Sequence, residues 1–185
     1  MRGLPVLRTR EPGGAKGAEL LRGLLLADGI DWSAPAETLL HFAARAEHVE
    51  RSIRPALAAG MWVICDRFAD STLAYQGCGQ GADRAMIATL TGLLGIAPDL
   101  TLMLDVADDI AAERLKRRAT ALDRYERQDA QFHQRVNEGF RAIAAAEPER
   151  CVTIAAGGTI DDVHAAILAA IEAWRDGAGR GGKFP

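Results

Sequence analysis

Hydrophobic positions fall into two patterns along this chain. Short continuous apolar runs, typical of strands buried in a parallel sheet, lie at residues 4–8, 61–65, 100–104 and 151–154. Between them, apolar residues recur three or four positions apart, as on one face of a helix. These helical stretches lie at about 18–27, 33–60, 83–94, 108–118, 132–143 and 159–174. Strands that alternate with helices predict an α/β fold, a parallel sheet with helices on both faces.

The longest predicted helix carries two different faces. Its apolar stripe, which we expect to face the core, consists of Leu39, Phe42, Ala46, Val49, Ile53 and Leu57. His41 and Arg45 are four residues apart on another face of the same helix. We therefore expect these two side chains to serve a site and not the core.

Polar clusters follow the predicted strands, at residues 8–14, 66–81 and 105. Ligands of parallel α/β sheets bind outside the carboxyl ends of the strands, so these clusters mark the expected site. No repeat or linker interrupts the pattern. We expect one domain over residues 1–176 and a Gly/Arg-rich tail over 177–185.

Composition narrows the class of protein. The 185 residues are 49% hydrophobic and 25% charged, with a formal net charge of −3, as in an ordinary soluble domain. No apolar run is long enough for a membrane span, and the acidic balance argues against a nucleic-acid coat. Three cysteines without a C-x-x-C pair are typical of a reducing compartment, and we expect a cytoplasmic protein.

Arginines at strand ends and in loops suggest a phosphorylated ligand, because guanidinium groups bind phosphate oxygens in pairs. Most arginines in any chain are solvated surface charges. Arg67, directly after a predicted buried strand, and Arg45, beside His41, are the two that position sets apart.

Four segments together resemble a known family. They are Arg8-Thr-Arg-Glu-Pro-Gly-Gly14, Asp66-Arg67-Phe68 with Ser71-Thr-Leu-Ala-Tyr-Gln-Gly77, Pro98-Asp-Leu-Thr-Leu-Met-Leu-Asp105, and Leu122-Asp-Arg-Tyr-Glu126. In this order and spacing they are similar to thymidylate kinases of the bacterial type, from about Arg8 to Trp174. Other kinases with a phosphate-binding loop lack the combination of AYQG with Glu-Pro-Gly-Gly.

The resemblance implies a P-loop-kinase-like fold and transfer of a phosphoryl group from ATP, with Mg²⁺, to dTMP, giving dTDP. It also implies a homodimer.

The resemblance implies a role for individual residues as well. Arg45 and Thr72 match residues that contact the thymine, and Tyr75 matches the aromatic residue under the deoxyribose. The alternatives are that Thr72 caps a helix and that Tyr75 is a core residue. Arg22 and Arg67 match contacts with the acceptor phosphate. The remaining implied site residues are Glu11, Pro12, His41 and Gln76 for substrate, with Asp66 beside Arg67 as catalytic; a cis proline is common at Glu11-Pro12.

The resemblance further implies a lid over the donor phosphates at about residues 117–127, with Arg117, Arg118 and Arg124 as its cations. An arginine that arrives with lid closure stabilises the charge of the transition state. Arg118 is the expected catalytic arginine, and a cation that offsets a helix dipole is the alternative.

The chain departs from the family in three places. It contains no G-x-x-x-x-G-K-[ST] phosphate loop, since Gly13-Gly-Ala-Lys-Gly17 has the wrong spacing. We therefore expect the first strand, the phosphate loop and the first helix to be missing, the sheet to have unpaired edges, and ATP-dependent turnover by this chain to be very low. Two interpretations remain open: a truncated form of an active enzyme, and a non-catalytic relic that binds dTMP or a partner.

The other two departures are single residues. His41 stands where the family has a stacking phenylalanine, and Ala155 stands where it has an aspartate.

Overall fold

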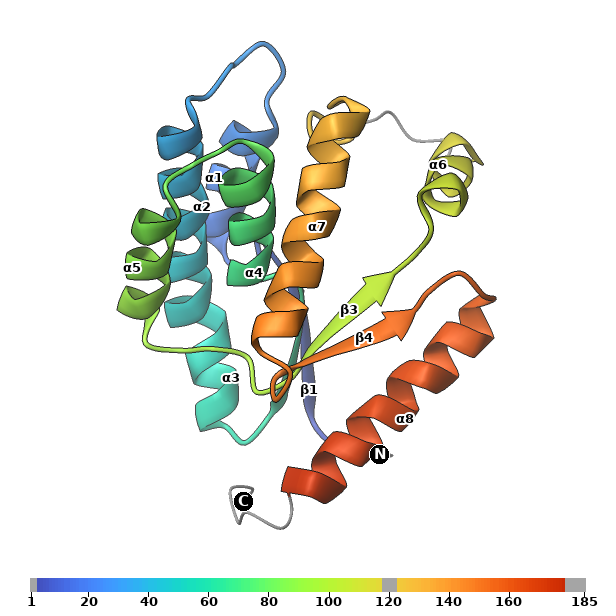
Figure 1. Cartoon of the computed structure of the whole chain (residues 1–185). Helices are drawn as coiled ribbons and strands as arrows, with labels where there is room; N and C mark the ends of the chain where they lie inside the picture. Colours follow the sequence, from blue (N-terminus) through green and yellow to red (C-terminus); the bar gives the residue numbers. More distant parts are fainter. Residues whose placement is uncertain (1–2, 118–122, 179–185) are drawn as a thin grey trace. The chain divides into compact units, whose positions relative to one another are not determined.

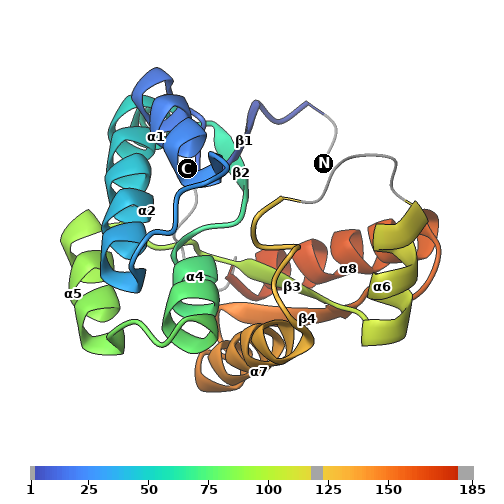
Figure 2. The same cartoon turned by 90° about the horizontal axis from the view of Figure 1, so that it is seen from above.

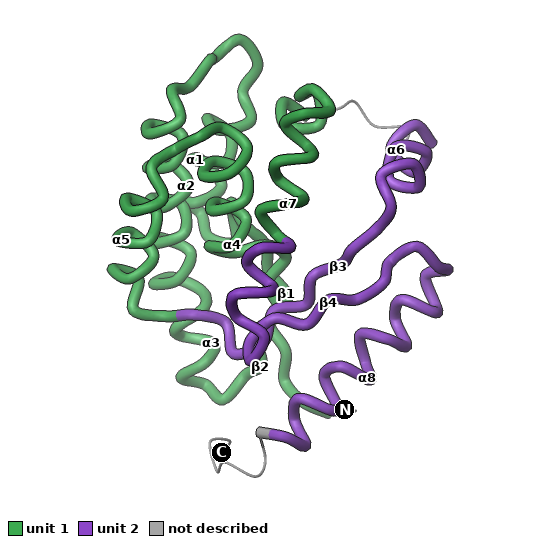
Figure 3. The backbone as a smooth tube through the Cα atoms, in the orientation of Figure 1, with its two compact units in different colours: residues 1–96, 123–140 green, residues 97–122, 141–185 purple. Residues whose placement is uncertain are grey.

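The structure is a computed structural model that describes residues 3–117 and 123–178. These residues form two compact units (Figure 3). Unit 1 contains residues 1–96 and 123–140, and unit 2 contains residues 97–122 and 141–185. Each unit is built around its own pair of parallel strands.

Unit 1 holds most of the helices. Its elements are β1 (Val6–Arg10), α1 (Lys16–Leu26), α2 (Ala34–His48), the π-helical turn η1 (Val49–Ile53), α3 (Arg54–Ala58), β2 (Trp62–Asp66), α4 (Ala69–Thr72), the π-helical segment η2 (Leu73–Gly79), α5 (Arg84–Leu94) and the first part of α7 (Ala130–Ala146). Helices α1 and α2 lie side by side (Figures 1 and 2).

Unit 2 contains β3 (Thr101–Asp105), α6 (Asp108–Arg117), the end of α7, β4 (Cys151–Ala155) and α8 (Ile160–Ala178). Helix α8 packs on β4 (Figure 1). No helix in the described ranges is both long and apolar enough to cross a membrane.

Both strand pairs are parallel, with Val6 opposite Trp62 in one and Thr101 opposite Cys151 in the other. The α/β class with parallel strands is therefore confirmed. The expectation that the apolar runs are buried on both faces is wrong for part of each strand: Ile64 and Leu104 are each 55% exposed. Over the described residues each sheet has only two strands, so every strand is an edge strand with side-chain neighbours in the sheet on one side only.

The predicted helices all exist, with ends that move by a few residues. The stretch expected over 33–60 is divided by η1 just before Pro55, whose missing backbone N–H interrupts the regular ladder. The polar cluster at 66–81, where no helix was predicted, is largely helical as α4 and η2, so its polar residues are held on regular elements. Helix α8 extends to Ala178, two residues into the predicted tail.

The apolar stripe predicted over residues 33–60 is confirmed in part. Phe42, Val49 and Ile53 are buried, whereas Leu39 in α2 and Leu57 in α3 are 51% and 45% exposed. His41 and Arg45, on the face expected to serve a site, are buried as well. Burial of a charged group is tolerated when partners satisfy it, and this helix meets that condition with partners distant in sequence. Periodicity of apolar residues alone does not reveal such a face.

Candidate functional site

A pocket in unit 1 collects every residue that the sequence predicted to bind substrate: Glu11, Pro12, Arg22, His41, Arg45, Arg67, Thr72, Tyr75 and Gln76. They come from the loop after β1, from α1 and α2, and from the segment that follows β2. The fold thus brings together side chains that are far apart in the sequence, such as Glu11 and Gln76, which are 65 positions apart. Of the residues predicted as catalytic, Arg67 lines the pocket, whereas Asp66 is exposed at the end of β2 and is not part of the lining.

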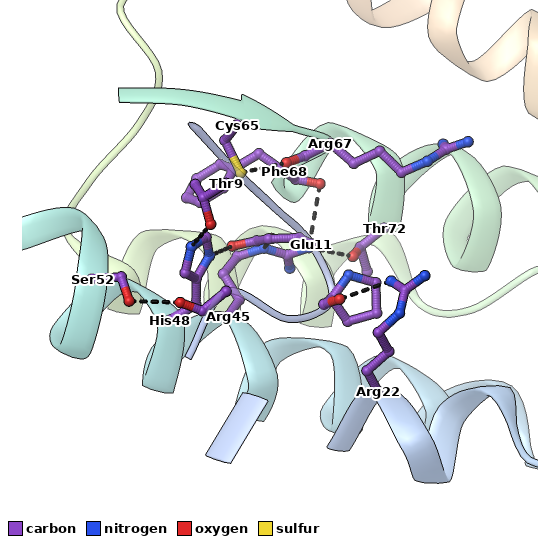
Figure 4. Close-up of polar contacts among 12 residues, drawn as sticks. Thr9, Glu11, Arg22, Arg45, His48, Ser52, Cys65, Arg67, Phe68 and Thr72 are labelled. Atoms are coloured by element: carbon purple, nitrogen blue, oxygen red, sulfur yellow. Dashed lines mark hydrogen bonds and ion pairs between the residues drawn. The ribbon is translucent and has the colours of Figure 1, made fainter. Parts of the chain in front are cut away.

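The loop after β1 forms one wall. The Glu11–Pro12 peptide bond is cis, as the resemblance implies. The backbone N–H of Glu11 donates to the carbonyl of Asp66, which ties this loop to the end of β2, at 2.9 Å. Arg22 Nη1 donates to the carbonyl of Pro12 at 2.8 Å, so α1 holds the turn from the other side (Figure 4).

Arg45 is the most constrained cation of the pocket. Its side chain is 2% exposed, and Nε donates to Glu11 Oε2 at 2.6 Å. Nη2 donates to Thr72 Oγ1 at 3.1 Å and to the carbonyl of Phe68 at 3.2 Å (Figure 4). Nη1 is buried and finds no hydrogen-bond partner among the described residues. An unpaired buried donor is costly, so this nitrogen is the group of the pocket that most needs a ligand acceptor.

Glu11 has a second partner in His48, a fully buried residue at the end of α2. His48 Nδ1 lies 3.0 Å from Glu11 Oε1, and His48 Nε2 lies 2.7 Å from Thr9 Oγ1. Gly14, at φ +81°, passes directly over this pair: a Cβ there would be 2.3 Å from Nε2 and 2.4 Å from Oγ1. Only glycine fits this position, for both its backbone angle and its space.

Arg67 and Tyr75 form the opposite wall. Arg67 has φ 67°, a left-handed conformation that is uncommon outside glycine, and it turns the chain sharply after β2. Its guanidinium lies 5.1 Å from the centre of the Tyr75 ring, within range of a cation–π contact. Arg67 and Arg22 both line the pocket, and they are the cations available there for an anionic group besides Arg45.

Tyr125 is a pocket residue that the sequence reasoning missed. Its hydroxyl donates to Glu37 Oε1 at 2.9 Å and lies 2.9 Å from His41 Nε2. Because a phenol has one proton and Glu37 takes it, His41 Nε2 carries a proton and donates to Tyr125. The Tyr125 ring also meets Tyr75 edge-on, at 5.6 Å between centroids. The only sequence signal was its place beside Arg124 in the fourth motif.

Burial keeps both members of this pair neutral. Desolvation, reinforced by the charges of Arg45, Arg124 and Arg67, lowers the pKa of His41 from its usual 6.5 to about 3. Desolvation and the neighbouring Glu37 carboxylate raise the pKa of the Tyr125 phenol far above its usual value. His41 therefore contributes a neutral ring to the pocket at physiological pH.

Glu37 is fully buried and organises the remaining contacts. Its Oε1 accepts from Gln76 and Gln80 at 2.8 Å each, besides Tyr125, and its Oε2 lies 2.8 Å from Arg124 Nη2. Arg124 also donates to the carbonyl of Leu25 at 3.1 Å. In this structure Arg124 thus ties residues 123–125 to α1 and α2; that it contacts donor phosphates stays a prediction.

The other predicted lid cations lie elsewhere. Arg117, at the end of α6, is exposed and pairs with Glu113 one turn earlier. Arg118 lies outside the described residues. The lid role of both arginines stays a prediction.

One group of side chains in the described ranges meets the geometric condition for a metal site. Donor atoms of Glu11, His48 and Cys65 lie within 4.8 Å of one another. Both carboxylate oxygens of Glu11 are already bound, to Arg45 and His48. Desolvation raises the pKa of the Cys65 thiol to about 12, and a cationic guanidinium adjoins the carboxylate. This trio suits a hydrogen-bond network, and with one oxygen ligand it does not fit Mg²⁺.

The pocket therefore offers guanidinium donors, one of them unsatisfied, beside neutral aromatic rings. That combination fits a planar base with a carbonyl oxygen, joined to a phosphate. The model of the thymidylate kinase family matches residues 1–167.

The chain belongs to the thymidylate kinase family. It is 51% identical to the thymidylate kinase of Rhizorhabdus wittichii over 174 residues, which is 92% of this chain and 84% of that protein. It is 51% identical to the thymidylate kinase of Gluconobacter oxydans, over 91% of this chain and 81% of that protein. The crystal structure of the thymidylate kinase of Ehrlichia chaffeensis superposes with a TM-score of 0.70 and 38% identity, over 91% of this chain and 80% of that one. The resemblance based on four motifs is confirmed.

Proposed function

We propose that this thymidylate kinase family member binds dTMP in the unit 1 pocket as the acceptor of a phosphoryl group from ATP, giving dTDP. The observation that carries the proposal is Arg45 Nη1, a buried donor that has no hydrogen-bond partner among the residues that the structure describes. A thymine carbonyl oxygen is such an acceptor. Arg22 and Arg67 would bind the 5′-phosphate, and His41 and Tyr75 would flank the base and the deoxyribose.

The transfer would be direct, from ATP to the acceptor phosphate. Arg22 and Arg67 would hold the attacking phosphate oxygen in line with the donor, which lowers the entropic part of the barrier. ATP would bring Mg²⁺, but the described residues offer no oxygen-rich set for it, and we assign it no step. As in the resemblance, the working unit would be a homodimer.

The donor side needs a phosphate-binding loop, and none of the 185 residues forms the G-x-x-x-x-G-K-[ST] motif. We therefore propose that this chain by itself binds dTMP and transfers phosphate very slowly.

Calorimetric titration of the 185-residue chain with dTMP and with dCMP tests the acceptor site. The amine of cytosine replaces the thymine carbonyl and would face Arg45 as one donor against another, so dCMP should bind at least tenfold more weakly. Equal affinities would refute the role of Arg45. A coupled assay with ATP and Mg²⁺ then decides between slow transfer and none.

A further inference from the structure

His48 lies outside the pocket lining, yet it is a fully buried partner of the pocket residue Glu11. Its side chain has no exposed surface, and it sits one turn after Arg45 at the end of α2. Nothing in the proposed reaction uses it. What it contacts, however, leads step by step to the one unsatisfied donor of the site.

The partner of His48 Nδ1 decides that this nitrogen carries a proton. Glu11 is paired with Arg45, and a carboxylate only accepts hydrogen bonds. His48 Nδ1, 3.0 Å from Glu11 Oε1, must therefore carry a proton and donate it. The group beside Nε2 is the Thr9 hydroxyl, which both donates and accepts, so it fits this arrangement in either protonation state of the ring.

The contact of His48 with Glu11 also affects Arg45, because both residues bind the same carboxylate. Glu11 accepts from His48 at Oε1 and from Arg45 Nε at Oε2, so its carboxylate plane is held from both sides (Figure 4). A bidentate contact of this carboxylate would pair Oε1 with Arg45 Nη2, the nitrogen on the Nε side of the guanidinium, and His48 holds Oε1 instead. Nη2 therefore stays on Thr72 and the carbonyl of Phe68, which fixes the guanidinium plane, and Nη1 on the far side has no partner among the described residues.

We infer that His48 is a positioning residue for base recognition: by holding Glu11 Oε1, it leaves Arg45 Nη2 to Thr72 and so fixes the guanidinium plane in which Nη1 is available to the ligand. This inference rests on the proposed function, because the ligand of Nη1 is taken to be the base of dTMP. Its prediction is selective, since His48 should affect recognition of the base and not of the sugar phosphate.

Two substitutions of similar size separate the two nitrogens of the ring. His48→Asn places an amide N–H near the position of Nδ1 and keeps a donor for Glu11, but it loses Thr9. His48→Gln reaches toward Thr9 and leaves Glu11 Oε1 without its donor. We expect His48→Asn to bind dTMP within about threefold of the parent and His48→Gln to bind about tenfold more weakly, as for loss of a hydrogen bond to a charged group.

Deoxyribose 5-phosphate, which lacks the base, serves as the matched ligand. If His48 acts through Arg45, both variants should bind it as the parent chain does, measured by ligand-observed NMR. Equal loss of dTMP affinity in the two variants would overturn the inference, as would a parallel loss of deoxyribose 5-phosphate binding by His48→Gln, because either result indicates general disruption.

A measurement without any substitution completes the test. Long-range ¹⁵N–¹H correlation spectra of the ¹⁵N-labelled 185-residue chain should show a proton on Nδ1 of His48. A proton on Nε2 alone would overturn the inference even if dTMP binds. Failure of the parent chain to bind dTMP would instead refute the proposed function, so the two results are distinguishable.

Discussion

The ion pair between Glu11 and Arg45 is buried at 2% exposure on both sides. A pair of this kind adds little net stability when it forms in the fold, but loss of one partner strands the other charge without water. Glu11→Gln should therefore lower the free energy of unfolding by about 3 kcal/mol, measured by urea denaturation. The other hydrogen bonds of Arg45 do not replace the lost charge.

A surface ion pair provides the control. Glu50 and Arg54 are paired one helical turn apart, and their side chains are 64% and 44% exposed. Glu50→Gln should change the free energy of unfolding by no more than about 0.5 kcal/mol. If both substitutions had equally small effects, the Glu11 carboxylate would not be compensating a buried charge.

His41 gives stability a defined dependence on pH. Its pKa is about 3 in the folded chain, against the usual 6.5, with Tyr125, Glu37 and the guanidinium groups of Arg45, Arg124 and Arg67 around it. Between these two pH values His41 binds a proton in the unfolded chain but not in the folded chain. The contribution of His41 to the free energy of unfolding is therefore fully present above pH 6.5 and is lost as the pH falls toward 3.

His41→Phe should remove this contribution. The loss of unfolding free energy between pH 7 and pH 5 should be smaller in the variant by about 2 kcal/mol, as urea titrations at the two pH values measure. The comparison of the two chains cancels the other titrating groups. An identical pH dependence in both would mean that His41 takes up its proton at the same pH in the folded and the unfolded chain.

At the scale of elements, the loop between β1 and α1 depends on Gly14. Gly14→Ala would place a Cβ 2.3 Å from His48 Nε2 at a φ of +81°. Gly29 offers a matched control, with φ +79° and nothing within 4 Å of the corresponding Cβ. Both substitutions carry the cost of a left-handed backbone, about 1 kcal/mol, but only Gly14→Ala should also displace His48 and weaken dTMP binding.

Thermal unfolding and calorimetry of the two variants measure this difference. Gly29→Ala should bind dTMP with the affinity of the parent chain, and Gly14→Ala should bind it more weakly. If both variants bound dTMP equally well, the loop would accommodate the Cβ of residue 14 without moving Thr9 or His48.

Sequence patterns predicted elements better than faces. The strands and most helices were found because periodicity and turn residues are local signals, and of the described helices only α4 and η2 were missed. The buried side of the 33–60 stretch was predicted in part: Phe42 and Val49 are buried, but Leu39 is apolar and exposed, and Arg45 is charged and buried. The partner that makes burial of Arg45 possible, Glu11, is 34 residues away, and no local pattern encodes that distance.

The same reason explains the missed site residues. Tyr125 and Glu37 are 88 positions apart and meet only through the fold. Six of the nine predicted substrate residues lie in the segments that resemble the family, and Arg22, His41 and Arg45 were matched to it outside those segments. His48 lies in none of the segments, and Tyr125 lies in one that carried no substrate role. Both strand pairs were predicted as fully buried, and the exposed Ile64 and Leu104 depend on how many strands adjoin, which one strand does not reveal.

At the scale of the whole molecule, the proposed site belongs to unit 1 alone, although that unit combines residues 1–96 with residues 123–140. Saturating dTMP should therefore slow hydrogen exchange at short labelling times in peptides around residues 11–22, 41–48, 67–76 and 123–133. Peptides from α8 should exchange at the same rate with and without dTMP. Mass spectrometry measures both sets, and equal protection of α8 would place ligand contacts outside the pocket.

Because the Arg45 guanidinium is already fixed, the rotamer entropy of this side chain is lost when the chain folds and not when the ligand binds. Immobilising a long side chain costs up to about 2 kcal/mol of rotamer entropy, and a mobile arginine incurs that cost when its ligand arrives. Arg45 is immobilised by Glu11, Thr72 and Phe68 as the chain folds, so ligand binding gains from a donor that is already ordered. Affinity and stability then depend on the same bonds, and a change that loosens the packing of α2 weakens binding without touching the pocket.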